Sequence, residues 1–258
     1  MYGATIYGIL CSGLSDKTKL SFVSANSSFI ECVRKNQLFH LFSVADNTHS
    51  PTCTINGTAA TTPDCNTSLN NFFDDTSLYV FTSCVWSACA GDFGTAICVC
   101  NPDIELTVND CQFVSCEASS VNGSGIYAQS ANIVHVQNSL FYDCKVLSGS
   151  NGEEGGGGIY LNSISTETLI TTSDFIKCVV KYDGGGVNIW SSNSTNGNDK
   201  TFQKCRFIKC HGDNEYYSEG GGIMAYDNNY YIGITNCLFC ECKNCFGGAV
   251  RISVPQDL

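Results

Sequence analysis

Four cysteines near the C-terminal end of the chain are the first residues whose type and spacing could do chemistry. They are Cys237, Cys240, Cys242 and Cys245, in the stretch CLFCECKNC. Four thiolates at such short spacings are typical of a structural zinc site or a metal cluster. Cys237 and Cys242, however, also belong to columns that recur along the chain without extra cysteines. We therefore interpret these cysteines as structural, and we predict no metal and no other cofactor.

Carboxylates and histidines are the second set of residues that could act in catalysis. Clustered aspartates beside histidine would suit polysaccharide hydrolysis, and a strong base beside calcium-binding carboxylates would suit a lyase. The chain has one adjacent aspartate pair, Asp74 and Asp75, in a stretch of loop-like composition. The histidines fall at unrelated places, namely His40, His49, His135 and His211. We predict no catalytic residues, and a polysaccharide lyase or hydrolase is kept as the third hypothesis.

Two short signatures alternate along the chain and indicate what positions these residues. In the first, glycines precede an aliphatic residue, which is Ile97, Ile126, Ile159, Val187, Ile223 or Val250. In the second, an aromatic residue is followed three positions later by cysteine. The aromatic residues are Phe29, Trp86, Phe113, Phe141, Phe175, Phe207 and Phe239, and the cysteines are Cys32, Cys89, Cys116, Cys144, Cys178, Cys210 and Cys242. A unit of about 30 residues that recurs in this way is typical of a repeat protein.

The residues between the signatures alternate apolar and polar, as in IVHVQNSLF (133–141), which indicates strands and not helices. Stacked strand-only units predict an all-β parallel β-helix of about eight coils, with the glycines at a corner. We predict a single domain over residues 1–258, with a degenerate coil and a loop insertion at 33–83 and regular coils at 84–252. Because the 57 residues from Phe29 to Trp86 equal about two repeat units, one coil is expected between the coil of Phe29 and the coil of Trp86. The last coil is expected to end the rod without a cap.

Together, the two signatures resemble the repeats of polymorphic outer membrane proteins, whose marks are GGAI and FxxN, and similar repeats in trichomonad surface proteins. The stretch GGAV (247–250) is nearest to the glycine motif, and FxxC stands where FxxN is expected. The resemblance covers residues 84–252 well and 1–83 loosely. It implies a right-handed β-helix, a solenoid, and adhesion at a cell surface.

The cysteine column is predicted to consist of buried, reduced thiols. The position two residues before the aromatic holds serine or cysteine, namely Ser27, Cys84, Cys111, Ser139, Ser173, Cys205 and Cys237. The cysteine after the aromatic persists where this position is serine, so a bond between the two columns does not hold it. Stacked neighbours have parallel Cα–Cβ directions, which disulfide geometry disfavours. Reduced thiols favour a cytoplasmic location, with the cell surface as the alternative if the chain is a fragment of a larger protein.

Charge and the variable insertions indicate the kind of partner. The net charge of −11 argues against nucleic acid and anionic membrane surfaces, and no apolar run reaches the length of a transmembrane helix. The insertions between each cysteine and the next glycine run are acidic and rich in tyrosine. Their candidate binding residues are Glu153, Glu154, Tyr182, Asp213, Glu215, Tyr216, Tyr217 and Glu219. They predict an edge that binds a protein with a basic surface, or alternatively plain solvated turns.

From these features we predict a rigid, non-enzymatic structural or interaction protein, such as a component of a cytoskeletal assembly, with end-to-end assembly through its open end. A cell-surface adhesin is the alternative hypothesis.

Overall fold

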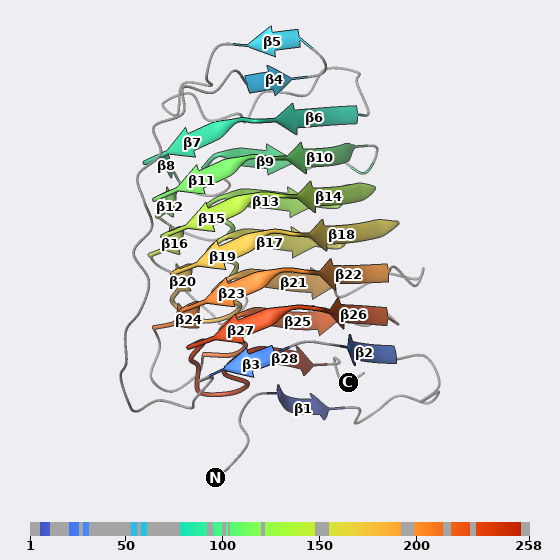
Figure 1. Cartoon of the computed structure of the whole chain (residues 1–258), viewed down its shortest axis with the longest axis vertical. Helices are drawn as coiled ribbons and strands as arrows, with labels where there is room; N and C mark the ends of the chain where they lie inside the picture. The colour runs from blue at the N-terminus through green and yellow to red at the C-terminus, as the bar shows by residue number, and fades with distance from the viewer. Residues whose placement is uncertain are drawn as a thin grey trace.

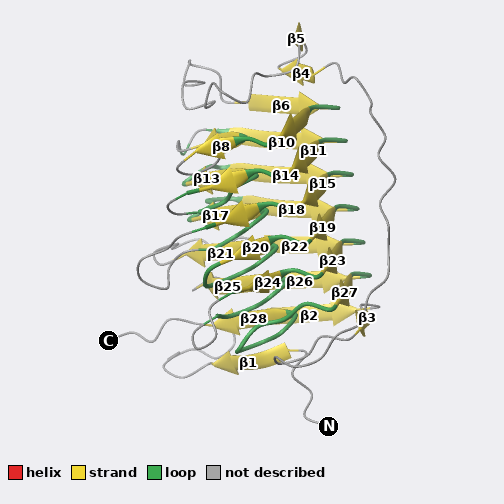
Figure 2. Ribbon diagram, turned by 90° about the vertical axis from the view of Figure 1, so that its left-hand side faces the viewer, coloured by secondary structure: helices red, strands yellow, loops and turns green. Residues whose placement is uncertain are grey.

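The computed structural model describes a stack of parallel β-strands (Figures 1 and 2). The described residues are 6–10, 21–25, 28–30, 53–55, 58–60, 78–91, 95–99, 102, 104–119, 122–147, 155–191, 199–213, 218–227 and 231–253, with backbone alone for residues 6–60. These residues contain strands, turns and no helix. The predicted all-β solenoid with parallel sheets is therefore confirmed.

The strands form four sheets that run along the stack. Sheet A contains β1 (Ile6–Leu10), β28 (Val250–Ser253), β25 (Ile223–Asp227), β21 (Val187–Ser191), β17 (Ile159–Asn162), β13 (Ile126–Gln129) and β9 (Ile97–Val99), in that order. Sheet B contains β2 (Ser21–Ala25), β26 (Tyr231–Thr235), β22 (Asp199–Gln203), β18 (Glu167–Thr171), β14 (Ile133–Gln137), β10 (Glu105–Asn109), β6 (Leu78–Thr82), β4 (Cys53–Ile55) and β5 (Thr58–Ala60).

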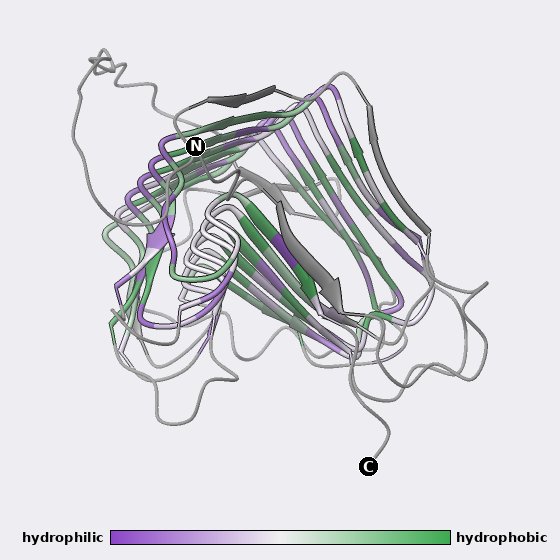
Figure 3. Cartoon of the chain, turned by 90° about the horizontal axis from the view of Figure 1, so that it is seen from below, coloured by the Kyte–Doolittle hydropathy of each residue, from purple (hydrophilic) through white to green (hydrophobic). Residues whose placement is uncertain are grey.

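Sheets C and D complete each coil. Sheet C contains β3 (Ser28–Ile30), β27 (Leu238–Cys240), β23 (Arg206–Ile208), β19 (Asp174–Ile176), β15 (Leu140–Tyr142), β11 (Gln112–Val114) and β7 (Val85–Ser87). Sheet D contains β24 (His211–Gly212), β20 (Val179–Val180), β16 (Lys145–Val146), β12 (Glu117–Ala118) and β8 (Ala90–Gly91). Viewed along the stack, successive coils superimpose (Figure 3). The purely parallel sheets have at most seven strands, so the predicted count of eight coils is not confirmed.

Four corners turn the chain from one sheet into the next, and three of them lead into sheets C, D and A. Between sheets B and C the corner residue is left-handed, such as Thr172 (φ 51°), and between sheets C and D the corresponding residue is Lys177 (φ 55°). The corner between sheets D and A uses glycine instead, for example Gly156 (φ 73°). A Cβ on Gly158, two residues further on, would lie 2.9 Å from Cδ1 of Phe175. The glycine run therefore forms a corner and a close approach to the core, as predicted.

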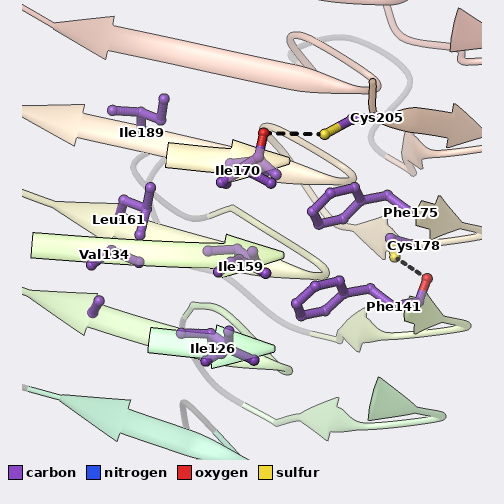
Figure 4. Close-up of a cluster of buried hydrophobic side chains, with 14 of the residues drawn as sticks. Ile126, Val134, Phe141, Ile159, Leu161, Ile170, Phe175, Cys178, Ile189 and Cys205 are labelled. Atoms are coloured by element: carbon purple, nitrogen blue, oxygen red, sulfur yellow. Dashed lines mark hydrogen bonds between the residues drawn. The ribbon is translucent and has the colours of Figure 1, made fainter. Parts of the chain in front are cut away.

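The core is built around a column of stacked aromatic rings. Trp86, Phe113, Phe141, Phe175, Phe207 and Phe239 follow one another with ring centroids 4.5–4.8 Å apart and nearly parallel planes. All six side chains are buried. In Figure 4 the rings of Phe141 and Phe175 lie one above the other, beside the aliphatic residues of sheets A and B. The parallel register places each aromatic residue directly opposite its counterpart in the next coil, so the repeat itself produces the column.

The two ends of the stack differ from the prediction. Strands β1, β2 and β3 pair with β28, β26 and β27, so Phe29 lies in register with Phe239 and not two coils from Trp86. The expectation that the last coil ends without a cap is wrong, because these N-terminal strands cover its edge (Figure 1). At the other end, β4 pairs antiparallel with β6 and with β5, within the predicted degenerate coil at 33–83. The sequence did not reveal this order because every coil carries the same signatures.

Candidate functional site

The predicted binding edge lies beside the corner that leads from sheet D into sheet A, which we call the glycine corner. Its left-handed residues are Gly123, Gly156, Gly184, Gly220 and Gly247. Three predicted edge residues are described, namely Tyr182, Asp213 and Glu219. The others, Glu153, Glu154, Glu215, Tyr216 and Tyr217, lie outside the described residues. The structure thus places part of this edge, and the binding role of the whole set stays a prediction.

A compact charged cluster occupies the glycine corner, where Asp183 and Glu219 each stand directly before a corner glycine. The two residues form a parallel bridge between adjacent coils, and the backbone N–H of Glu219 donates to Oδ1 of Asp183 at 3.0 Å. The guanidinium Nε of Arg251 lies 2.8 Å from Oε2 of Glu219, and the same guanidinium lies over the ring of Phe246. Glu219 is therefore engaged within the fold and is not a free carboxylate at the rim.

Burial governs the protonation of this cluster. Asp183 is almost fully buried, and burial, with the neighbouring charge of Glu219, raises the pKa of Asp183 to about 8. Burial also raises the pKa of Glu219, and the adjacent Arg251 opposes that shift. At neutral pH the two carboxyls thus share a site with one arginine, and Asp183 holds its proton. This arrangement ties three successive coils together at one corner.

Sequence reasoning identified Glu219 but not Asp183 or Arg251. A signal was present, because an acidic residue precedes the glycine run in both DGGG and EGGG. The described surface nearby is also charge-paired. Nε2 of His211 lies 3.0 Å from Oδ1 of Asp213, and this contact raises the pKa of His211.

The thiol column, here Cys89, Cys116, Cys144, Cys178, Cys210 and Cys242, lies inside the rod. All six are buried and none is in a disulfide bond, and Cys32 lies outside the described residues. The thiol of Cys178 donates to the carbonyl of Phe141 in the preceding coil at 3.4 Å, as Figure 4 shows, and Cys210 donates in the same way to Phe175 at 3.2 Å. Burial raises the pKa of Cys178 well above its usual range. Enclosed in the core, the thiols of this column act as small packing groups.

The second column, two residues before each aromatic, explains why serine and cysteine replace one another there. The backbone N–H of Cys111 donates to Oγ of Ser139, and the N–H of Ser139 donates to Oγ of Ser173. In the next coil the thiol of Cys205 donates to the carbonyl of Ile170 at 3.3 Å (Figure 4). Cys84 departs from the predicted reduced state, because it is disulfide-bonded.

The residues considered for catalysis or metal binding are dispersed. His135 contacts Glu167 across two strands of sheet B at 3.1 Å, whereas His211 belongs to sheet D, and Asp74 and Asp75 lie outside the described residues. In the CLFCECKNC stretch, Cys237 and Cys242 are buried while Cys240 and Cys245 are partly exposed. Within the part of the chain that the structure describes, no three His, Cys, Asp or Glu side chains are grouped so as to hold a metal ion.

Comparison with known proteins identifies no relative: no family model, no curated protein and no solved structure matches this chain. The resemblance to the polymorphic outer membrane protein repeats therefore stays a prediction. The described residues contain no helix that could span a membrane.

Proposed function

We propose that this protein is a rigid, non-enzymatic rod, a right-handed β-helix of about eight coils that serves as a structural or interaction protein. The observation that supports this best is the unbroken column of stacked, buried rings from Trp86 to Phe239. Close-packed aromatic stacks resist local deformation, because each ring is held on both faces. A rod of this kind presents loops at fixed spacing, which suits recognition of another protein more than a chemical step.

The binding surface in this proposal is the edge at the glycine corner. Insertions of different length precede the corner glycines, at 147–155 and 212–219, and these insertions carry the acidic and tyrosine residues. Tyrosines are enriched at interface hot spots, and carboxylates at a rim mainly set the association rate. With a net charge of −11, the favoured partner is a protein with a basic surface.

A comparison of two tyrosine variants tests this assignment. Changing Tyr216 and Tyr217 together to Ser should reduce recovery of a basic partner from native lysate while leaving the circular dichroism spectrum unchanged. The matched control is Tyr142→Ser, because Tyr142 is a partly exposed tyrosine of sheet C. Lysine at Glu153 and Glu154 should slow association and weaken its dependence on salt. Equal recovery with the wild type and the Tyr216/Tyr217 variant would remove this edge as the binding surface.

The location proposed for the rod is the cytoplasm, including association with a cytoskeleton. Twelve described cysteines are not disulfide-bonded, which is the state expected in a reducing compartment. The second candidate is a cell-surface adhesin, favoured by the disulfide at Cys84 and by the repeat resemblance. Thiol titration of the native protein isolated under alkylating conditions separates the two, since an adhesin should yield mostly disulfides.

A polysaccharide lyase or hydrolase is the third candidate. Incubation with polygalacturonate and mixed glycans, with and without calcium, should yield neither new reducing ends nor unsaturated uronates. Turnover that a single acidic substitution abolishes would replace the structural assignment with an enzymatic one.

A further inference from the structure

The last coil of the rod is completed by the other end of the chain. Ile6 of β1 pairs with Val250 of β28, and Phe22 of β2 pairs with Ile232 of β26. Phe29 of β3 pairs with Phe239 of β27. In all three sheets the N-terminal strands therefore continue the parallel register of the coils before them (Figures 1 and 2).

The order of strands in this terminal coil is composite. A regular coil passes from sheet A through B and C to D, as in β13, β14, β15 and β16, before sheet A is entered again. Strand β28 takes the sheet A position next to β25, while the sheet B and sheet C positions next to β26 and β27 are filled by β2 and β3. Strand β1 is consequently displaced one layer further, onto β28, and its pairing contains a register shift between Tyr7 and Ile9. Two segments distant in sequence thus meet at one docking edge.

The connection between β3 and β4 is long enough for β1–β3 to dock on their own molecule or on another copy. Strands β2 and β4 lie seven steps apart in the order of sheet B, which is about 34 Å at roughly 4.8 Å per step. Between β3 and β4 the chain has 22 residues, 31–52, which can span up to about 75 Å when extended. The connection therefore reaches its own docking edge with about 40 Å to spare, which is the length available for reaching a second molecule.

We propose that the edge formed by β26, β27 and β28 is a docking site that also accepts β1–β3 from a second copy of this chain. The product is a strand-exchanged dimer in which each rod is completed by the other molecule. The pairing in the dimer is the same as in the monomer, so the balance depends on the local concentration of the tethered strands. The proposal gives the predicted self-assembly a mechanism, and it is independent of the edge at the glycine corner.

Shortening the connection tests the proposal directly. Deletion of residues 33–48 leaves six residues between β3 and β4, with a reach of about 20 Å, which is too short for docking within one molecule. Light scattering during size-exclusion chromatography should then give twice the mass of one chain. As a control, the same sixteen residues are replaced with a Gly-Ser repeat of equal length, and this variant should match the wild type. A monomeric, folded deletion variant whose residues 1–30 are cleaved rapidly by protease would overturn the proposal.

A second measurement does not depend on the deletion variant folding. Consecutive residues of a parallel strand direct their N–H groups to opposite sides. A full-chain variant with proline at Phe22 and Val23 of β2 and at Ser28 and Phe29 of β3 therefore loses a donor toward β26 and a donor toward β27, whichever residue faces the edge. A fluorescent peptide of residues 1–32 should bind this variant at least tenfold more tightly than the wild type, whose edge is occupied. Equal or undetectable binding to both would show that the strands do not dock between molecules. Neither outcome depends on the tyrosine variants, so failure here leaves the proposed partner edge to its own test.

Discussion

Replacing Phe175 is the most direct test of whether the ring column stiffens the rod. Its ring is fully buried and lies between the rings of Phe141 and Phe207, with centroids 4.7 Å away on each side. A Cβ on Gly158 would lie 2.9 Å from Cδ1 of the same ring, so this residue faces the ring edge without a side chain that could fill a vacancy. Truncation at this position should therefore leave a cavity in the middle of the stack.

The expected magnitude follows from these contacts. Phe175→Ala should lower the free energy of unfolding by about 3–5 kcal/mol, the usual cost of deleting a buried phenylalanine side chain. Phe175→Leu keeps most of the apolar volume but loses both stacked neighbours, which should cost about 1–3 kcal/mol at roughly 0.5–1.5 kcal/mol per aromatic pair. In the double variant with Phe141→Leu, the stacking energy between the two rings is lost once, whereas the sum of the two single variants counts its loss twice. The cycle should therefore show a coupling of about 0.5–1.5 kcal/mol.

Urea denaturation followed by circular dichroism measures Phe175→Ala, the two single leucine variants and the double leucine variant. The midpoint should fall while the slope with denaturant stays the same, because the surface exposed on unfolding changes little. Additive effects of the two leucine substitutions would refute the reasoning, since they would show that the rings fill space without stacking energy. The same conclusion would follow if Phe175→Ala cost less than about 1 kcal/mol.

Three further changes probe the corner, the charged cluster and the thiols. Gly158→Ala should destabilise the protein more than Ala249→Gly, because the added Cβ would lie 2.9 Å from the ring of Phe175, whereas Ala249 already occupies the matching place in the last coil. Comparison of their melting temperatures tests this. The pKa of Asp183 is raised from 3.8 to about 8, so the folded protein retains a proton that the unfolded chain releases, and stability should fall as the pH rises through this window. Asp183→Asn should lose less stability between pH 5 and pH 8 in urea titrations, and parallel losses in both proteins would contradict the assignment. Cys178→Ser should fold with a loss of about 1–2 kcal/mol, and the buried thiol of Cys178 should react with a thiol reagent only after unfolding.

The repeat made much of the fold predictable from sequence. The period of the aromatic and cysteine signatures indicated parallel coils because a stacked register places identical residues opposite one another, as at Phe141 and Phe175. Because the signatures are alike in every coil, they did not reveal the order in which the coils stack. Nothing in the signature around Phe29 distinguishes the predicted place two coils from Trp86 from the observed place next to Phe239. A local pattern thus specifies the shape of a coil but not its place in the stack.

The charged cluster was harder to predict for a related reason. Glu219 and Arg251 are 32 positions apart, and their contact exists because one coil brings them to the same corner. Reading each insertion separately placed Glu219 in a partner-binding edge, with a solvated turn as the alternative. Aligning the coils by the corner glycine would have placed Asp183 and Glu219 in one column, where two carboxyls on adjacent coils require a counter-charge.

The corners also explain where the chain can vary and so where a partner can be recognised. At the corners between sheets B and C and between sheets C and D, a single left-handed residue is followed at once by an inward serine or cysteine, as at Thr172–Ser173 and Lys177–Cys178. The side chain of that inward residue bonds a carbonyl two residues back, so an extra residue would misplace it and break the column. Insertions are therefore confined to the segments that enter and leave sheet A, such as 148–154 and 192–198. Selection for a new partner can act on these segments without disturbing the core, and the proposed binding function uses those that enter sheet A, at the glycine corner.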